Sequence, residues 1–219
     1  MMLVLAGAAL SIATARAVLA AVHAATMPPD QALQLLLDGN KRFVAGKLEH
    51  PNQGPDRRAE VAKGQHPFAA VLACSDSRTP PEIIFDRGLG DIFTVRVAGN
   101  VADKVVIESL DYSVKHLGVR VVMVLGHRRC GAVIAAVEGH EGTADQDVGP
   151  MLSELRPAVA ESKGMAGDPV ENAVRENVML VMKNLATSAE LSAMVKAGEL
   201  KIVGGVYDLD TGTIEMLKE

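Results

Sequence analysis

The chain has 219 residues, of which 48% are hydrophobic and 22% charged, and its net charge is −5 at pH 7. This length and composition are typical of a globular domain with one core, and they exclude a disordered or fibrous protein. The acidic balance and the lack of long basic runs argue against a nucleic-acid partner. With no tryptophan, four Phe and two Tyr, the chain has no evident stacking platform for bases or sugars, so a small ligand fits better.

The N-terminal segment, residues 1–26, differs in composition from the rest. It has no acidic residue and one basic residue, Arg16, and it ends in small residues around Ala24 and Ala25. This pattern is typical of a secretory signal peptide, so we expect residues 27–219 to form a single periplasmic or secreted domain. A basic stretch before the apolar run is missing, which leaves open a cytoplasmic protein whose first segment is not a signal. Arg16 divides the apolar run, so no membrane span is expected in the mature chain.

The first predicted element is an amphipathic helix over residues 30–46, capped by Asp30 and ended by Gly46. Polar residues rich in turn formers follow, with a short helix about residues 57–63. Three apolar runs come next, and continuous runs rich in β-branched residues predict strands buried on both faces. These runs occupy residues 68–74, 91–100 and 119–127.

Helical segments separate the apolar runs. Residues 80–88 open on two prolines, and residues 104–118 close on Gly118. Strands that alternate with helices are typical of a parallel sheet with crossover connections. We therefore predict an α/β fold, with a mostly parallel central sheet flanked by helices.

The C-terminal third predicts two helices and a hairpin. Asp168 precedes a proline and caps the first helix, and Glu171 completes a capping box. The second helix spans residues 188–197. Residues 201–217 predict two strands around a turn at residues 208–212, and this hairpin is expected to supply an antiparallel edge strand.

Two of the predicted strands end in residues that can bind a metal. Cys74 ends the first strand, His127 ends the third, and Cys130 follows three residues later at the start of a helix. In open parallel sheets, ligands bind beyond the carboxyl ends of the strands. One imidazole and two thiolates suit tetrahedral zinc and leave a fourth position open for water or substrate. The same residues also allow a structural corner, a disulfide between the two cysteines, or a metal-free redox pair.

The motif "CSDSR", which begins at Cys74, and the later motif "GHRRCGA" resemble the β-class carbonic anhydrases. The resemblance covers most of residues 30–219 through the segments "KGQHPFAAVLACSDSR", "GDIFTVRVAGN" and "VYDLDTG". It implies that one zinc ion per chain binds to Cys74, His127 and Cys130. It further implies that zinc-bound hydroxide attacks carbon dioxide reversibly to give bicarbonate and a proton. The chain departs from many members of the family at the pair Arg128 and Arg129, which leaves the zinc ligands unchanged.

The acid and the base inside the first motif match the catalytic dyad of that family. Asp76 lies close enough to Cys74 to accept a hydrogen bond from the metal-bound hydroxide, or to bind the metal itself. Arg78 can hold the Asp76 carboxylate in a two-pronged ion pair. A structural ion pair at a strand end is the plainer alternative.

The resemblance also implies four residues that contact the substrate. Gln65 would donate a hydrogen bond to bicarbonate, Phe93 and Tyr112 would wall an apolar pocket, and Gly131 would offer a backbone N–H. A turn residue and two core aromatics are the plainer alternatives for the first three. The implied site is shared across the interface of a homodimer or a higher even oligomer. The sequence leaves open hydrolysis of carbon disulfide or carbonyl sulfide at the same zinc site, and a zinc-binding protein without turnover.

Overall fold

The structure is a computed structural model of the chain and describes residues 27–139 and 149–218. The signal peptide predicted at residues 1–26 lies outside the described residues. The described residues form one sheet in the order β2-β1-β3-β4-β5, in which only the β4–β5 pair is antiparallel. Its strands are β1 (Ala69–Ala73), β2 (Ile92–Arg96), β3 (Val121–His127), β4 (Lys201–Tyr207) and β5 (Ile214–Met216). The predicted α/β fold with an antiparallel edge is confirmed.

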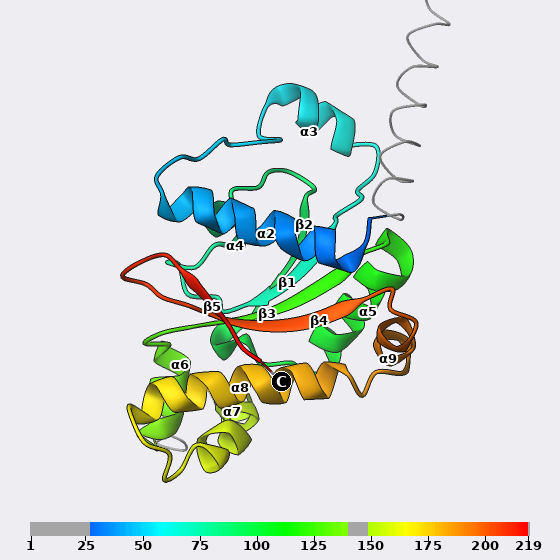
Figure 1. Cartoon of the computed structure of the whole chain (residues 1–219). Coiled ribbons are helices and arrows are strands. Elements are labelled where there is room, and N and C mark those ends of the chain that lie inside the picture. The colour runs from blue at the N-terminus through cyan, green and yellow to red at the C-terminus, as the bar shows by residue number, and fades with distance from the viewer. Residues whose placement is uncertain (1–26, 140–148, 219) are drawn as a thin grey trace, which may run out of the picture.

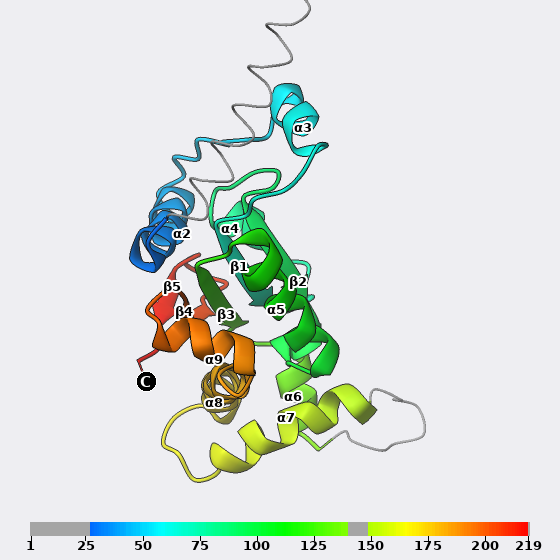
Figure 2. The ribbon, with the colours of Figure 1, turned by 90° about the vertical axis from the view of Figure 1, so that its right-hand side faces the viewer.

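Helices cover both faces of the sheet (Figure 1). One face carries α2 (Pro29–Val44) and α4 (Pro81–Ile84), and α3 (Pro55–Val61) lies farther out. The other face carries α5 (Lys104–Leu117), α6 (Gly131–Val137), α7 (Gly149–Glu161), α8 (Pro169–Leu185) and α9 (Ala189–Lys196). A 3-10 turn, η1 (Ala98–Asn100), follows β2. In the view of Figure 2, the strands lie between α2 and the pair formed by α7 and α8.

Side chains that alternate along the buried strands divide the core between the two faces. In β1, Ala70 and Leu72 pack in the cluster that includes α5 and α8, whereas Ala69, Val71 and Ala73 pack in the cluster that includes α2. Every residue of β1 and β3 is buried. This burial is the reason that the two segments are apolar throughout instead of alternating with polar residues.

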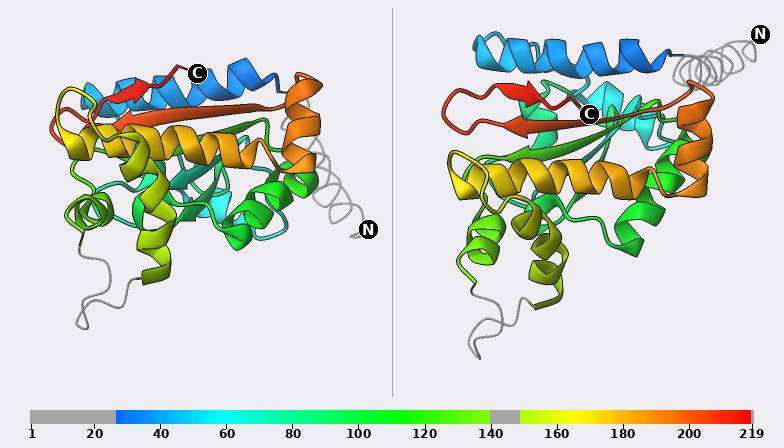
Figure 3. Two further views of the ribbon diagram at one scale, coloured as in Figure 1. Left: turned by 90° about the horizontal axis from the view of Figure 1, so that it is seen from below. Right: turned by 60° about the horizontal axis from the view of Figure 1, so that its bottom comes forward.

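Two glycines let α8 lie lengthwise along the sheet, as Figure 3 shows. A Cβ atom at Gly126 would lie 2.7 Å from Cγ2 of Val178, and one at Gly204 would lie 2.5 Å from Sδ of Met182. Both distances are too short for real contacts, so a larger residue at either position would force Val178 or Met182 to move. Since Gly126 directly precedes His127, this close packing also sets the distance between α8 and the site.

Three expectations about element ends prove wrong. The run at residues 91–100 is a strand only as far as Arg96, because Gly99 (φ 67°) and Asn100 (φ 43°) adopt left-handed conformations that end it. The first helix is capped by Pro28 and not by Asp30, which lies in its first turn. The helical segment predicted at residues 80–88 is only the four-residue α4.

The C-terminal elements follow the prediction with one difference. Asp168 Oδ1 accepts a hydrogen bond from the backbone N–H of Glu171 at 2.9 Å, which confirms the cap. The Glu171 carboxylate, which was expected to complete a capping box, instead contacts the Arg128 guanidinium and accepts from the Arg129 N–H. Helix α7 is not among the predicted elements, because Pro150 and Pro157 mask its helical pattern.

Within the part of the chain that the structure describes, no single helix has the length and apolar character that crossing a membrane requires. Helices α8 and α9 are long and apolar enough only when they are taken together, and the chain bends by 90° between them. Seven residues of α8 are buried against the rest of the protein, so its apolar side is the core side of a packed helix.

Candidate metal centre

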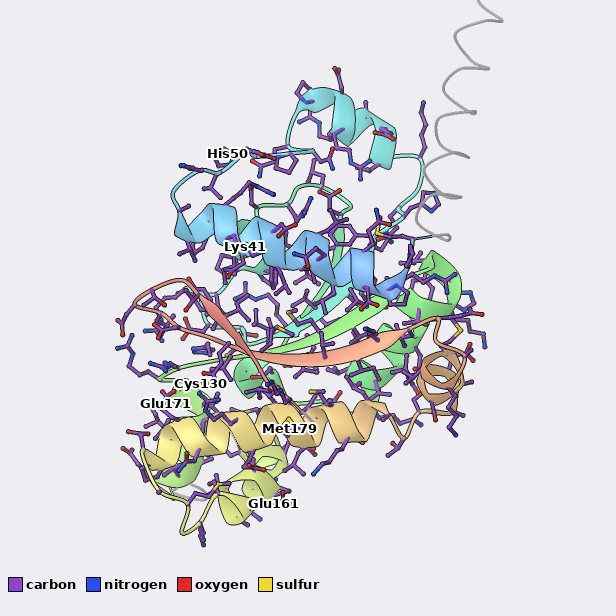
Figure 4. All side chains as sticks on the ribbon, viewed as in Figure 1. Lys41, His50, Cys130, Glu161, Glu171 and Met179 are labelled. Carbon is purple, nitrogen blue, oxygen red and sulfur yellow. The ribbon has the colours of Figure 1, made fainter. Side chains whose placement is uncertain are left out.

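Three potential metal ligands meet at the carboxyl end of the sheet. Cys74 directly follows β1, His127 is the last residue of β3, and Cys130 caps the start of α6. Because β1 and β3 are parallel neighbours, with Ala73 opposite Leu125, their ends lie side by side. The ligand atoms of the three residues all lie within 4.8 Å of one another, and all three residues are buried. Figure 4 labels Cys130 at this end of the sheet, beside Glu171 at the start of α8.

The two sulfur atoms are spaced as metal ligands and not as a disulfide. Cys74 Sγ and Cys130 Sγ lie 3.9 Å apart, and both cysteines are free. Two thiolates on one tetrahedral zinc ion, each at about 2.3 Å, would be separated by about 3.8 Å. The disulfide alternative is therefore not formed, and the spacing fits zinc.

The imidazole of His127 is oriented for a metal. Its Nδ1 lies 2.9 Å from the carbonyl oxygen of Arg128, which can only accept, so Nδ1 carries the proton. Its Nε2 then carries a lone pair, is buried and has no hydrogen-bond partner. An unpaired buried polar atom is unfavourable by about 1–3 kcal/mol. A cation between this nitrogen and the two sulfurs would satisfy it.

Hydrogen bonds converge on the sulfur of Cys74. The backbone N–H groups of Asp76 and Gly99 donate to it at 3.4 Å and 3.3 Å. The hydrogen bond from Cys130, followed by those from the two backbone groups, lowers the pKa of Cys74 although burial opposes the shift. The same bond and burial raise the pKa of Cys130. Without a cation only one of the two sulfurs can be anionic, whereas a divalent ion would favour both thiolates.

Asp76 and Arg78 form the predicted two-pronged ion pair at the edge of this cluster. Arg78 Nε donates to Oδ1 of Asp76 at 2.9 Å, and Nη2 donates to Oδ2 at 2.6 Å. This bonding holds the pKa of Asp76 well below its usual range although burial opposes the shift. Oδ2 of Asp76 lies 3.7 Å from Nε2 of His127. The carboxylate therefore borders the metal position while both of its oxygens bind Arg78.

The loop that carries Cys74 and Asp76 has further anchors that the sequence did not reveal. The guanidinium of Arg96 donates to the carbonyl oxygens of Cys74 at 2.9 Å and of Asp76 at 2.5 Å. The hydroxyl of Thr79 donates to the carbonyl oxygen of Asp76 at 3.1 Å. Arg96 is 22 residues away along the chain, so no local pattern could have indicated it.

The two arginines between His127 and Cys130 have acidic partners. Arg128 contacts Glu171 at 3.3 Å and Asp208 at 2.9 Å, and Arg129 contacts Asp210 at 2.8 Å. These ion pairs connect the loop of the metal ligands to α8 and to the β4–β5 hairpin. The positive charges of Arg128 and Arg129 are thus balanced by nearby carboxylates.

The four predicted substrate contacts do not all lie near the cluster. Gly131 lies near the cluster, since it directly follows Cys130 and its Cα faces open space. Gln65 is exposed and precedes β1, whereas Cys74 follows it, so the five residues of β1 separate them by roughly 16 Å. Phe93 pairs with Ala70 near the start of the strands, and its ring lies 6.4 Å from that of Tyr112. Within one chain, the last three residues therefore lie away from the metal ligands.

The comparisons with known proteins agree with this site. The family described as "Carbonic anhydrase" matches residues 69–214. "Carbonic anhydrase 2" of Mycobacterium tuberculosis is 41% identical over 190 residues, which cover 84% of this chain and 90% of that protein. The carbonic anhydrase of Mycolicibacterium smegmatis is 38% identical over 191 residues, covering 86% and 93%. The crystal structure of the β-carbonic anhydrase CafA of Aspergillus fumigatus has a TM-score of 0.64 at 33% identity and covers 75% of this chain and 81% of its own.

The parallel sheet, the buried Cys-His-Cys cluster and these similarities define one class of protein. The chain belongs to the carbonic anhydrase family, in its β class. As such it is an enzyme, a carbonate dehydratase.

Proposed function

We propose that the chain binds one zinc ion through Cys74, His127 and Cys130 and hydrates carbon dioxide reversibly to bicarbonate and a proton. The observation that carries this proposal is the buried Nε2 of His127, which has no hydrogen-bond partner and lies within 4.8 Å of both sulfurs. Zinc held by three protein ligands keeps an open position and lowers the pKa of water there, which supplies the nucleophile for carbon dioxide.

Several residues of the chain would orient the metal ligands and the reacting oxygen. The carbonyl of Arg128 fixes the tautomer of His127, and the N–H groups of Asp76 and Gly99 support negative charge on Cys74. Asp76 is held as a carboxylate, so it can accept a hydrogen bond from the reacting oxygen but cannot donate one. Arg78 donates to both carboxylate oxygens, which would keep Asp76 from becoming a fourth metal ligand.

The apolar side of the substrate pocket would come from a second copy of the chain. Phe93 and Tyr112 form a surface cluster in which Tyr112 is 48% exposed, and Gln65 is exposed as well. Their distance from the cysteines excludes a role in their own chain's site, but a twofold partner could present them to that site. We therefore propose a homodimer, or a higher even oligomer built from it.

The test combines stopped-flow hydration of carbon dioxide with measurement of bound zinc, for native protein prepared in a reducing, chelator-free buffer and for Cys74→Ser. We expect one zinc per native chain with hydration far above the buffer rate, and loss of both in Cys74→Ser. Ser77→Ala is a matched control, since Ser77 is exposed in the same loop, and it should retain both. Native protein with zinc but no hydration would leave a zinc-binding protein without turnover, and native protein without zinc would favour the redox pair.

Export to the periplasm or the medium is proposed from residues 1–26 alone, because their apolar, acid-free composition is typical of a signal peptide. N-terminal sequencing of the protein made in its own cell tests this proposal. A mature chain that begins near Met27 supports it, and an intact Met1 contradicts it.

A further inference from the structure

A buried asparagine on α8 reaches across the fold to the segment that touches the metal ligands. Asn177 is 3% exposed, and its Nδ2 donates to the carbonyl oxygen of Gly99 at 2.8 Å. The backbone N–H of Gly99 in turn donates to Sγ of Cys74 at 3.3 Å. Residue 177 is 78 positions from residue 99, so only the packing of α8 brings the two together.

The turn at Gly99 brings its backbone N–H to the Cys74 sulfur, and hydrogen bonds hold the turn on two sides. Gly99 and Asn100 both have positive φ, a conformation that glycine adopts freely and that asparagine tolerates better than most residues, and it ends the strand abruptly. A Cβ atom at Gly99 would lie 3.1 Å from Cδ1 of Leu155, so the position accepts only glycine without movement. The turn is tied to the cysteine loop by the N–H of Ser75, which donates to the carbonyl of Val97 at 3.2 Å. The Asn177 amide holds the turn from its other side.

We propose that Asn177 is a positioning residue for the metal centre: by holding the carbonyl of Gly99, it keeps the N–H of Gly99 directed at the Cys74 sulfur. An N–H donor draws charge from a thiolate and limits its movement, so this bond tunes the strength of the metal–sulfur bond. This inference rests on the proposed metal site, and it adds a residue that no motif around the ligands contains.

The same helix offers a matched control. Asn184 lies two helical turns beyond Asn177, and its Nδ2 donates to the carbonyl oxygen of Ala102 at 3.1 Å. Both asparagines therefore bind the backbone of one segment, residues 99–102, but only Gly99 contacts a cysteine sulfur. Asn184 is exposed whereas Asn177 is buried, so stability alone does not distinguish the two roles. A purely structural role would leave the sulfur-to-metal absorption unchanged in variants of both residues, whereas the positioning role changes it in Asn177 variants alone.

The experiment uses the full chain with cobalt(II) in place of zinc, because sulfur-to-cobalt charge-transfer absorption reports on the thiolates directly. The variants are Asn177→Asp, which keeps the shape but replaces the donor by an oxygen, Asn177→Ser, which shortens the side chain, and Asn184→Asp. We expect the charge-transfer band to move to longer wavelength in both Asn177 variants and to stay unchanged in Asn184→Asp. Zinc loss to a chelator should become about 10- to 100-fold faster in the Asn177 variants alone.

The outcomes separate this inference from the proposed function. If the native protein binds neither cobalt nor zinc, the proposed function fails, and the positioning role fails with it. If native protein binds the metal but folded Asn177 variants match it in spectrum and zinc release, only the positioning role is overturned. Failure of both Asn177 variants to fold, when Asn184→Asp folds, would likewise overturn it by assigning Asn177 to the fold.

Discussion

Asp76 and Arg78 are joined by two parallel hydrogen bonds, of 2.9 Å and 2.6 Å, while the same carboxylate lies 3.7 Å from Nε2 of His127. The pair is therefore both an ion pair and a border of the metal position. Because Arg78 is about half exposed, the pair contributes little to stability, on the order of 1 kcal/mol or less. Its effect should appear in catalysis.

Replacing Asp76 by Asn tests this assignment. The amide keeps the shape but loses the charge that pairs with Arg78 and one acceptor oxygen, so we expect kcat/KM for carbon dioxide to fall by about 100-fold or more. Bound zinc and the urea midpoint should remain close to native. Activity within a factor of two of native would instead assign the pair to structure, and Ser77→Ala serves as the control for changes in the loop.

The proposed sharing of the site between two copies predicts complementation between inactive chains. Gln65→Ala and Cys74→Ser each damage one contribution to a site, and in a twofold dimer these contributions come from different chains. A mixed dimer then contains one intact site, so unfolding and refolding an equal mixture should restore about a quarter of native activity. The measurement is carbon dioxide hydration before and after mixing.

A second mixture supplies the control for complementation. Cys74→Ser and Cys130→Ser both damage the same chain's ligands, so their mixed dimers should have no intact site. Recovery in this control, or no recovery with Gln65→Ala, would contradict a site shared between copies.

The close approach of α8 to Gly126 predicts a stability defect. Gly126→Ala places a methyl group 2.7 Å from Val178, and such overpacking destabilises a core by about 1–3 kcal/mol. We expect a lower urea midpoint, and faster zinc loss because His127 is the next residue. Gly64→Ala, where the nearest atom would be 4.0 Å away, should change neither quantity.

A buried carboxylate on the other face predicts acid sensitivity. Asp86 is 1% exposed and accepts from Arg42 Nε at 2.6 Å and from the N–H groups of Glu49 and His50 at 3.1 Å and 3.0 Å. Burial alone would raise the pKa of Asp86, but these hydrogen bonds outweigh it and hold the pKa below its usual value. The group therefore stabilises the fold above its unfolded pKa, and this stabilisation is lost as the pH falls.

Asp86→Asn is the corresponding variant. The native protein should be more stable than the variant at neutral pH, and the difference should shrink as the pH falls below about 4. Urea unfolding at a series of pH values measures this difference. A gap that stays constant down to acid pH would show that the charge of Asp86 does not contribute.

The local patterns predicted most of what sequence neighbours decide. The apolar runs indicated β1 and β3, the cap at Asp168 was correct, and Cys74 and His127 were correctly placed at strand ends, with Cys130 at the start of a helix. The errors fall where distant parts of the chain act on a segment. The left-handed turn at Gly99 packs against Leu155, and Glu171 binds the arginine loop instead of its own helix start.

The sequence by itself determined the α/β class, because that class depends on periodicity along the chain. The motifs that resemble a known family singled out Cys74, His127 and Cys130 as candidate metal ligands, with Asp76 and Arg78 as the acid–base pair, because each motif spans only a few residues. Only the tertiary structure decided which residues hold those ligands in place. Arg96 and Asn177 reach the cysteine loop from another strand and another helix, and Gln65 proved to lie at the wrong end of β1 for its own site. Such contacts depend on how the helices and strands pack, and local sequence patterns do not reveal that packing.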